Sequence, residues 1–197
     1  MRPSVGKEML AVMNTRLLLE RDVIPFQTLH LRAMQESPGA FGMTPEEFLQ
    51  SSSAHMAQWL HGNGDPPERF VLGAFDDQDH LIGKVGFWRE KQSNKQHKAS
   101  IWGLYVTPEA RGRGIGKLLL QDLLRRGTTL PGLEQVHLRV VTTNEAARHL
   151  YRSVGFRPYG LEPHAFKYGE QYLDEELLLF SWGRNEPGER CISTIPC

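Results

Sequence analysis

The sequence predicts a single α/β domain in which helices pack against a central sheet. The apolar run 101–106 has a β-branched residue at each end, which is typical of a buried strand. A glycine-rich turn follows, and then a leucine-rich segment, 117–124, that predicts a helix packed on the sheet. A second strand and helix are expected at 134–141 and 144–154. The 197 residues are enough for one domain with a full core.

Composition excludes several classes of protein. Lys plus Arg and Asp plus Glu both number 23, so the chain lacks the basic excess typical of nucleic-acid binding. No apolar run reaches the length of a membrane span, and the start has no signal-peptide core. Cys191 and Cys197 lie in a polar tail, and the eight His residues lack metal-ligand spacing. We therefore expect no metal, no nucleic acid, no membrane and a cytoplasmic location.

Helix signals organise the N-terminal part. Asp22 is expected to cap a helix that runs to about Gln35, where the following Ser-Pro-Gly stops it. Thr44, a Pro at the first helical position and Glu47 form a capping-box pattern, which predicts a helix to about His61.

The remaining elements complete the predicted domain, residues 14–184. Residues 1–13 are expected to form a flexible leader and residues 185–197 a flexible tail. The other predicted strands are 15–20, 70–75, 81–89, 100–106, 156–160 and 174–182; a helix is expected over 112–126, and loops over 90–98 and 161–173.

The turn between the first strand and helix described above carries the strongest chemical signal. It reads Arg111-Gly112-Arg113-Gly114-Ile115-Gly116. Glycines allow close backbone approach, and a helix N-terminus presents unpaired N–H groups and the positive end of its dipole. Two arginines add charge that suits pyrophosphate oxygens. The segment therefore predicts a phosphate-bearing ligand.

Two common phosphate loops do not fit this turn. A P-loop requires Ser or Thr after Gly-Lys, and here Leu118 follows Lys117. A dinucleotide fingerprint requires G-x-G-x-x-G, whereas these glycines are spaced G-x-G-x-G. A plain tight turn with solvated arginines remains the structural alternative.

Two motifs together resemble the GNAT N-acetyltransferase superfamily. Arg111, Gly114 and Gly116 match its pyrophosphate loop, R/Q-x-x-G-x-G/A, and Pro108 follows the preceding strand as in the family. The segment 144–156 matches N-x-x-A-x-x-L-Y-x-x-x-G-F, and 31–42 is similar to bacterial members of unassigned substrate. The resemblance implies a central mixed, mostly antiparallel sheet with a splayed strand pair and helices on both faces.

The resemblance also implies acetyl-CoA as donor and an amine acceptor that attacks directly in a ternary complex. Backbone groups of Leu104, Tyr105 and Val106 would contact the pantetheine arm, and one of their N–H groups would polarise the thioester carbonyl. The pyrophosphate would be held by the loop and first helical turn: Arg111, Gly112, Arg113, Gly114, Ile115, Gly116 and Lys117.

The second motif supplies two further candidates. Asn144 is a suitable helix N-cap, and the family also uses this residue near the pantetheine. Tyr151 would protonate the leaving thiolate, since a phenol of pKa ~10 can donate to a thiolate of pKa ~8.5 in close contact. The alternative for Tyr151 is a core aromatic.

The general base is not identified. Many family members carry a Glu on the strand ahead of the loop, but residues 99–104 contain no carboxylate. Glu36, Glu90, His164 and Asp174 are the candidates, each also explicable as a surface group. A water chain is another route, and positioning alone supplies part of the rate.

The acceptor pocket is expected from the two N-terminal helices and the 160–173 loop. A small amine, a polyamine or an antibiotic arm would suit such a pocket. Two other functions stay open: acetylation of a protein N-terminus or lysine, and a non-catalytic acyl-CoA-binding module. Homodimers are frequent in the family, which leaves a homodimer open. The expected acceptor residues, which alternatively only cover the sheet, are Phe41, Met43, Trp59, His164, Phe166, Tyr168 and Tyr172.

Overall fold

The computed structural model describes residues 14–37, 41–50, 56–57, 60 and 67–183. Within this part of the chain, strands form one seven-stranded sheet in the order β1-β2-β3-β4-β5-β7-β6. The β4–β5 pair is parallel and the other five pairs are antiparallel, which confirms the mixed, mostly antiparallel sheet. The strands are β1 (Asn14–Leu17), β2 (Arg69–Phe75), β3 (Leu81–Arg89), β4 (Lys98–Val106), β5 (Gln135–Val141), β6 (Arg157–Tyr168) and β7 (Gln171–Ser181).

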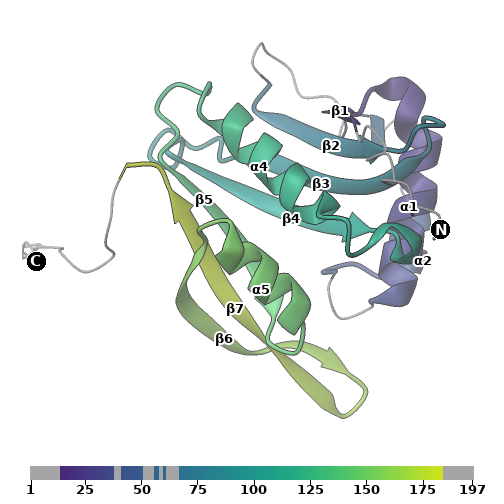
Figure 1. Cartoon of the computed structure of the whole chain (residues 1–197). Helices are drawn as coiled ribbons and strands as arrows, with labels where there is room; N and C mark the ends of the chain where they lie inside the picture. Colours follow the sequence, from purple (N-terminus) through teal and green to yellow (C-terminus); the bar gives the residue numbers. More distant parts are fainter. Residues whose placement is uncertain (1–13, 38–40, 51–55, 58–59, 61–66, 184–197) are drawn as a thin grey trace, which may run out of the picture.

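Helices cover both faces of the sheet (Figure 1). α1 (Val23–Glu36) and α2 (Pro45–Leu49) lie on one face, and α4 (Ile115–Gly127) and α5 (Glu145–Ser153) lie on the other. None of the described helices is both long and apolar enough to cross a membrane. The described residues also contain no group of three or more His, Cys, Asp or Glu placed to hold a metal ion.

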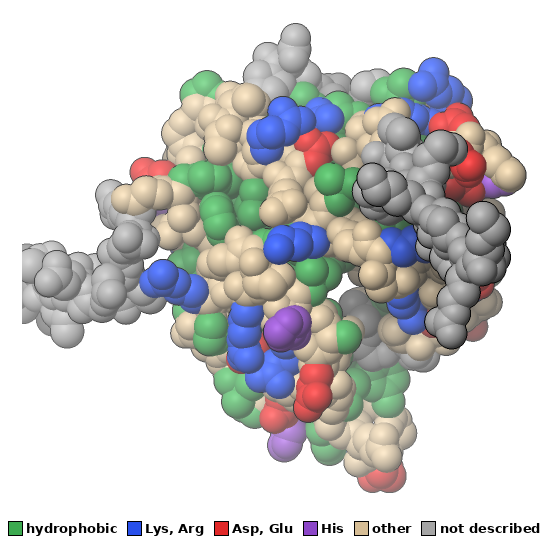
Figure 2. All heavy atoms as spheres, in the orientation of Figure 1, with side chains coloured by type: hydrophobic (Ala, Val, Ile, Leu, Met, Phe, Trp, Pro, Cys, Tyr) green, Lys and Arg blue, Asp and Glu red, His purple; other side chains and the backbone are tan. Residues whose placement is uncertain are grey.

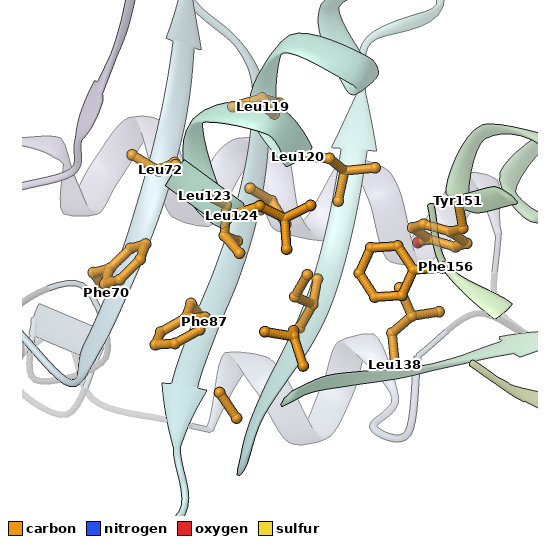
Figure 3. Packing of buried hydrophobic residues seen from close by; sticks show 14 of the residues in the cluster. Phe70, Leu72, Phe87, Leu119, Leu120, Leu123, Leu124, Leu138, Tyr151 and Phe156 are labelled. Carbon is orange, nitrogen blue, oxygen red and sulfur yellow. The ribbon is translucent and has the colours of Figure 1, made fainter. Parts of the chain in front are cut away.

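Each face has its own hydrophobic core. On the α4 face, leucines spaced at helical intervals pack against buried strand residues. Figure 3 shows the labelled leucines of α4 over Phe70 and Phe87, with Tyr151 and Phe156 beside Leu138. On the other face, Phe26 and Phe48 of the N-terminal helices pack against β2. The two cores fix both helix layers on the sheet.

The parallel strand pair is splayed. β4 and β5 pair from Lys98 opposite Gln135 to Ser100 opposite His137, and the pairing ends there. Both strands then continue, to Val106 and Val141. β5 keeps its partner on the other side, since β7 pairs with it along its whole length. The sheet therefore opens between the C-terminal halves of β4 and β5.

The prediction for the C-terminal region was wrong in one respect. The expected loop over 161–173 is instead the greater part of a long hairpin, in which β6 pairs with β7. Pro163 hides the continuation of this strand in the sequence, but β6 is an edge strand and tolerates residues that lack an N–H donor. Two register irregularities absorb the interruptions.

Several boundaries also differ. The first strand ends at Leu17 rather than residue 20, and the helix predicted from 112 begins at Ile115. Asp22 precedes α1, but its side chain makes no capping bond to that helix: it accepts hydrogen bonds from the Leu19 backbone and from Arg16. The Thr44 capping box forms as predicted. The leader, the tail, Trp59, both cysteines and much of the second predicted helix lie outside the described residues.

Candidate active site

A bulge in β4 shapes the splayed region. Tyr105 lies opposite Lys84 and Trp102 lies opposite Gly86, so two residues of β4 face one residue of β3. Gly103 occupies the bulge with a φ of +60°, a conformation that glycine adopts without strain. At the bulge, the backbone of β4 leaves the regular hydrogen-bonding pattern with β3. On its other side, β4 has already separated from β5 at this point.

Lys84 holds the bulge from the α1 face. Its side chain is fully buried, and Nζ donates a hydrogen bond of 2.7 Å to the Gly103 carbonyl oxygen. The ammonium lies 5.6–5.8 Å from the ring centroids of Phe26, Phe41 and Trp102, which is within cation–π range. Burial lowers the pKa of Lys84 from its usual 10.5 to about 7. Lys84 thus joins an aromatic cluster to the bulged backbone.

The lowered pKa predicts a pH-dependent stability. The unfolded chain keeps the Lys84 proton to about pH 10.5, whereas the folded protein releases it near pH 7, so the free energy of unfolding rises between these values. Relative to Lys84→Met, wild type should gain about 2 kcal/mol between about pH 7 and 9. Urea unfolding of both proteins across this range measures the difference. A constant difference would mean that the ammonium stays charged in the folded protein.

The glycine loop leads from β4 into α4. Gly114 is the N-cap of α4 with a φ of +78°, and no atom lies within 4 Å of where its Cβ would stand. Because Gly114 has no side chain, none competes for the first-turn N–H groups of α4. A Cβ on Gly116 would approach Leu150 to 2.9 Å, so this glycine permits close packing of α4 on α5. The loop therefore leaves the N-terminus of α4 open, and a helix terminus of this kind suits an anion.

The N-terminus of α5 faces the same region. The Asn144 side chain caps α5 by accepting a hydrogen bond of 3.1 Å from the Ala147 N–H, as predicted. Tyr151 lies two turns further along α5 and is 8% exposed. Burial raises the pKa of Tyr151, so the phenol stays protonated across the physiological range. Its ring packs edge-on against that of Phe156, with the centroids 6.0 Å apart and the planes at 66°, so its position is structurally supported.

A cavity of about 470 Å³ occupies the splay between β4 and β5. Figure 2 shows the molecule hollowed here, beside the N-terminal ends of α4 and α5. Of the predicted coenzyme-binding residues, only Arg113 does not line this cavity. The predicted residues that do are Leu104, Tyr105, Val106, Arg111, Gly112, Gly114, Ile115, Gly116, Lys117, Asn144 and Tyr151.

Arg111 is already engaged within the protein. Its Nε donates to the Val106 carbonyl at 3.0 Å, and its Nη2 forms an ion pair of 2.9 Å with Glu36. Glu36 also binds Arg32, which extends the network to Glu109. Arg111 thus ties the glycine loop to the end of α1, and its charge is partly neutralised.

A second cavity, of about 390 Å³, opens on the α1 face. It shares Phe41, Trp102 and Gly103 with the first, so the two cavities meet at the β4 bulge. Its other described lining residues are His30, Met34, Gly42, Met43, Arg69 and Trp88. Phe41 and Met43 were expected here; the four aromatic residues expected from 160–173 lie on the β6–β7 hairpin and line neither cavity.

The candidate general bases chosen from the sequence lie outside both cavities. The residues concerned are Glu36, Glu90, His164 and Asp174. Glu175 is the one acidic residue among the described residues that line the two cavities. It was not among the bases predicted from the sequence. The sequence feature that could have pointed to Glu175 is the run 174–176, three acidic residues at the start of an apolar strand. Strand alternation sends neighbours to opposite faces, but the sequence does not say which face borders the site.

Comparison with known proteins agrees with this geometry. Residues 31–156 match the model of the acetyltransferase (GNAT) family. The spermidine N(1)-acetyltransferase of Vibrio cholerae is 30% identical over 119 residues, which cover 60% of this chain and 65% of that protein. The N-alpha-acetyltransferase RimI of Mycobacterium tuberculosis is 45% identical over 89 residues, 44% of this chain and 52% of that protein. The matches therefore span less than two thirds of each of these relatives.

Solved structures share the fold. An acetyltransferase of the GNAT family from Streptococcus pneumoniae aligns with a TM-score of 0.74 at 19% identity, covering 86% of this chain and 99% of that one. A phosphinothricin acetyltransferase from Sinorhizobium meliloti, in complex with AcCoA, aligns with a TM-score of 0.73 at 21% identity, covering 93% and 96%. Fold and site together define a mixed-sheet α/β protein with an open, glycine-capped helix N-terminus beside a splayed strand pair. The chain belongs to the acetyltransferase (GNAT) family.

Proposed function

We propose that the protein transfers the acetyl group of acetyl-CoA to a primary amine of a small molecule, by direct attack in a ternary complex. The observation that carries this proposal is the meeting of two cavities at the β4 bulge. One cavity has the anion-binding terminus of α4, and the other opens on the opposite face of the sheet. Donor and acceptor can thus approach the same point from two sides.

The first cavity suits a pantetheine thiol ester joined to a pyrophosphate. Lys117 lines it at the start of α4, and the first-turn N–H groups of that helix add partial positive charge. The splay leaves β4 backbone without its β5 partner, so N–H groups near Leu104 can bind the arm and polarise the carbonyl. Tyr151 lines the same cavity and would protonate the leaving thiolate.

The second cavity favours a small acceptor. Its volume falls within the range of small-ligand sites, and Phe41, Trp88 and Trp102 supply aromatic walls. The described residues that line this cavity include no Asp or Glu, and they include one cationic side chain, that of Arg69. A polyamine would place a second ammonium near this cation, so we propose an acceptor with one ammonium and an apolar body.

A protein N-terminal amine is the second candidate acceptor. The supporting observation is the RimI relative, which has higher identity over its matched segment than the spermidine acetyltransferase has over its own. A third possibility, an acyl-CoA-binding protein without turnover, does not require a phenol at position 151. The presence of Tyr151 in the cavity favours the enzyme.

Calorimetric titration with acetyl-CoA tests the donor site. We expect saturable binding of acetyl-CoA and CoA, and none of ATP, because the splay accepts a pantetheine arm that ATP lacks. Thiol release should then be measured with phenethylamine, spermidine and an unacetylated N-terminal peptide. Phenethylamine is expected to give the highest kcat/KM of the three. A faster peptide would favour the protein acceptor, and binding without thiol release from any amine would contradict the enzyme.

A further inference from the structure

Glu175 occupies a position that the chemistry of the proposed function requires. On β7 it lies opposite Val141 of β5 and Glu162 of β6. The next residue, Glu176, binds Arg148 and Arg152 of α5, so strand alternation directs Glu175 to the opposite face of the sheet. Glu175 is among the residues that line the first cavity, and it is only 9% exposed. A carboxylate therefore borders the splay from the side on which the second cavity opens.

The charge of Glu175 is incompletely compensated. Arg139 Nη1 lies 3.7 Å from Glu175 Oε2, which is beyond hydrogen-bond distance, and the same nitrogen forms its close ion pair with Glu162. The groups that face Glu175 are thus one arginine on β5 and, on β6, the carboxyl of Glu162 and the phenol of Tyr168. Two carboxylates share one guanidinium, which leaves Glu175 able to attract a further cation.

The environment also adjusts its proton affinity. Burial raises the pKa of Glu175; Arg139 opposes this effect and the charge of Glu162 adds to it. By contrast, Glu36 is held by two arginines, and Asp174 accepts a hydrogen bond from the His164 backbone. Those two carboxylates are occupied, and neither lines either of the two cavities described.

We infer that Glu175 binds the ammonium of the acceptor and accepts its proton, an inference that rests on the proposed function. One N–H proton passes to the carboxylate and then to solvent. The free nitrogen attacks the thioester carbon, so a C–N bond forms and the C–S bond breaks. The Tyr151 phenol protonates the departing sulfur, and the second nitrogen proton restores the phenol. The products are the N-acetylamine, CoA thiol and one proton released to solvent.

Glu175→Gln tests this role, because the amide keeps the size of the side chain but cannot accept the proton. With phenethylamine, spermidine and the peptide as probes, kcat/KM at pH 7.5 should fall about 100-fold. The acetyl-CoA Kd should change less than about twofold, which also shows that the variant folds. The residual rate should rise tenfold per pH unit, because it depends on the free amine in solution. Glu170→Gln, at the exposed turn of the same hairpin, is the matched control and should keep wild-type kinetics.

Glu162→Gln gives an independent measurement. The substitution removes the negative charge of Glu162 beside Glu175, and Arg139 then has Glu175 as its carboxylate partner at this point. Both changes favour the ionised form, so the pKa of Glu175 should fall. The acid limb of the kcat/KM profile should therefore move to lower pH, with activity above pH 8 retained. Wild-type kinetics and pH profile in Glu175→Gln would overturn the role of Glu175 alone. No thiol release by wild-type protein from any of the amines would overturn the proposed function and this inference with it.

Discussion

Gly114→Glu is expected to abolish acetyl-CoA binding. The new carboxylate would stand at the N-cap of α4, where open space surrounds the Cβ position, and would itself occupy the anion site. Like unit charges ~4 Å apart repel by about 4 kcal/mol near a protein surface, which corresponds to nearly three powers of ten in Kd. Calorimetric titration should detect no saturation at concentrations about 100-fold above the wild-type Kd.

Gly169→Glu is the matched control for this variant. Gly169 has a φ of +60° and open space around its Cβ position, as Gly114 does, but it lies at the turn between β6 and β7. Both variants incur the cost of a side chain in the left-handed region, ~1–2 kcal/mol of stability. Only Gly114→Glu should lose the coenzyme. Unchanged affinity in that variant would contradict the placement of the pyrophosphate at this loop.

Tyr151→Phe should lower kcat by about 100-fold and leave the acetyl-CoA Kd within about twofold of wild type. The substitution removes the proton donor for the thiolate but keeps the ring that packs on Phe156. The raised pKa of Tyr151 keeps the wild-type phenol protonated, so this loss should persist throughout the pH range of the assay. Steady-state thiol release and calorimetry separate the two effects.

Tyr172→Phe serves as its control, because Tyr172 is exposed on β7 and lines neither cavity. It should retain wild-type kcat. An unchanged kcat in Tyr151→Phe would assign this residue to the core alone and would support the non-catalytic alternative. A parallel loss of coenzyme affinity and stability would also argue against a proton-donor role.

Local sequence patterns predicted most of the residues that the structure brings together around the first cavity. A glycine-rich turn ahead of a helix is a contiguous signal, because the backbone geometry that binds an anion is set within a few residues. The N-cap at Asn144 is equally local, and the structure contains the predicted hydrogen bond. Both features can be recognised without long-range information. In the structure, the N-terminal ends of α4 and α5 border the same cavity.

The proposed acceptor side could not be predicted in the same way. Lys84 and Gly103 meet through a bulge between two strands, and a register irregularity is not visible in either strand alone. The exposed edge position of β6 makes its prolines acceptable, so a turn-rich sequence formed a long strand. Arg111 looked free for a ligand, yet Glu36, 75 residues away, engages it.

The sequence by itself determined the fold class, and it named the candidate anion-binding loop and the candidate proton donor, because each depends on residues close together in the chain. Only the tertiary structure decided which carboxylate borders the splay. The sequence alone does not distinguish the three consecutive acidic residues 174–176. In the structure, strand pairing directs Glu176 to the arginines of α5 and Glu175 to the cavity. Which face of a strand meets a site is set by its neighbours in the sheet, since alternation defines two faces without naming either.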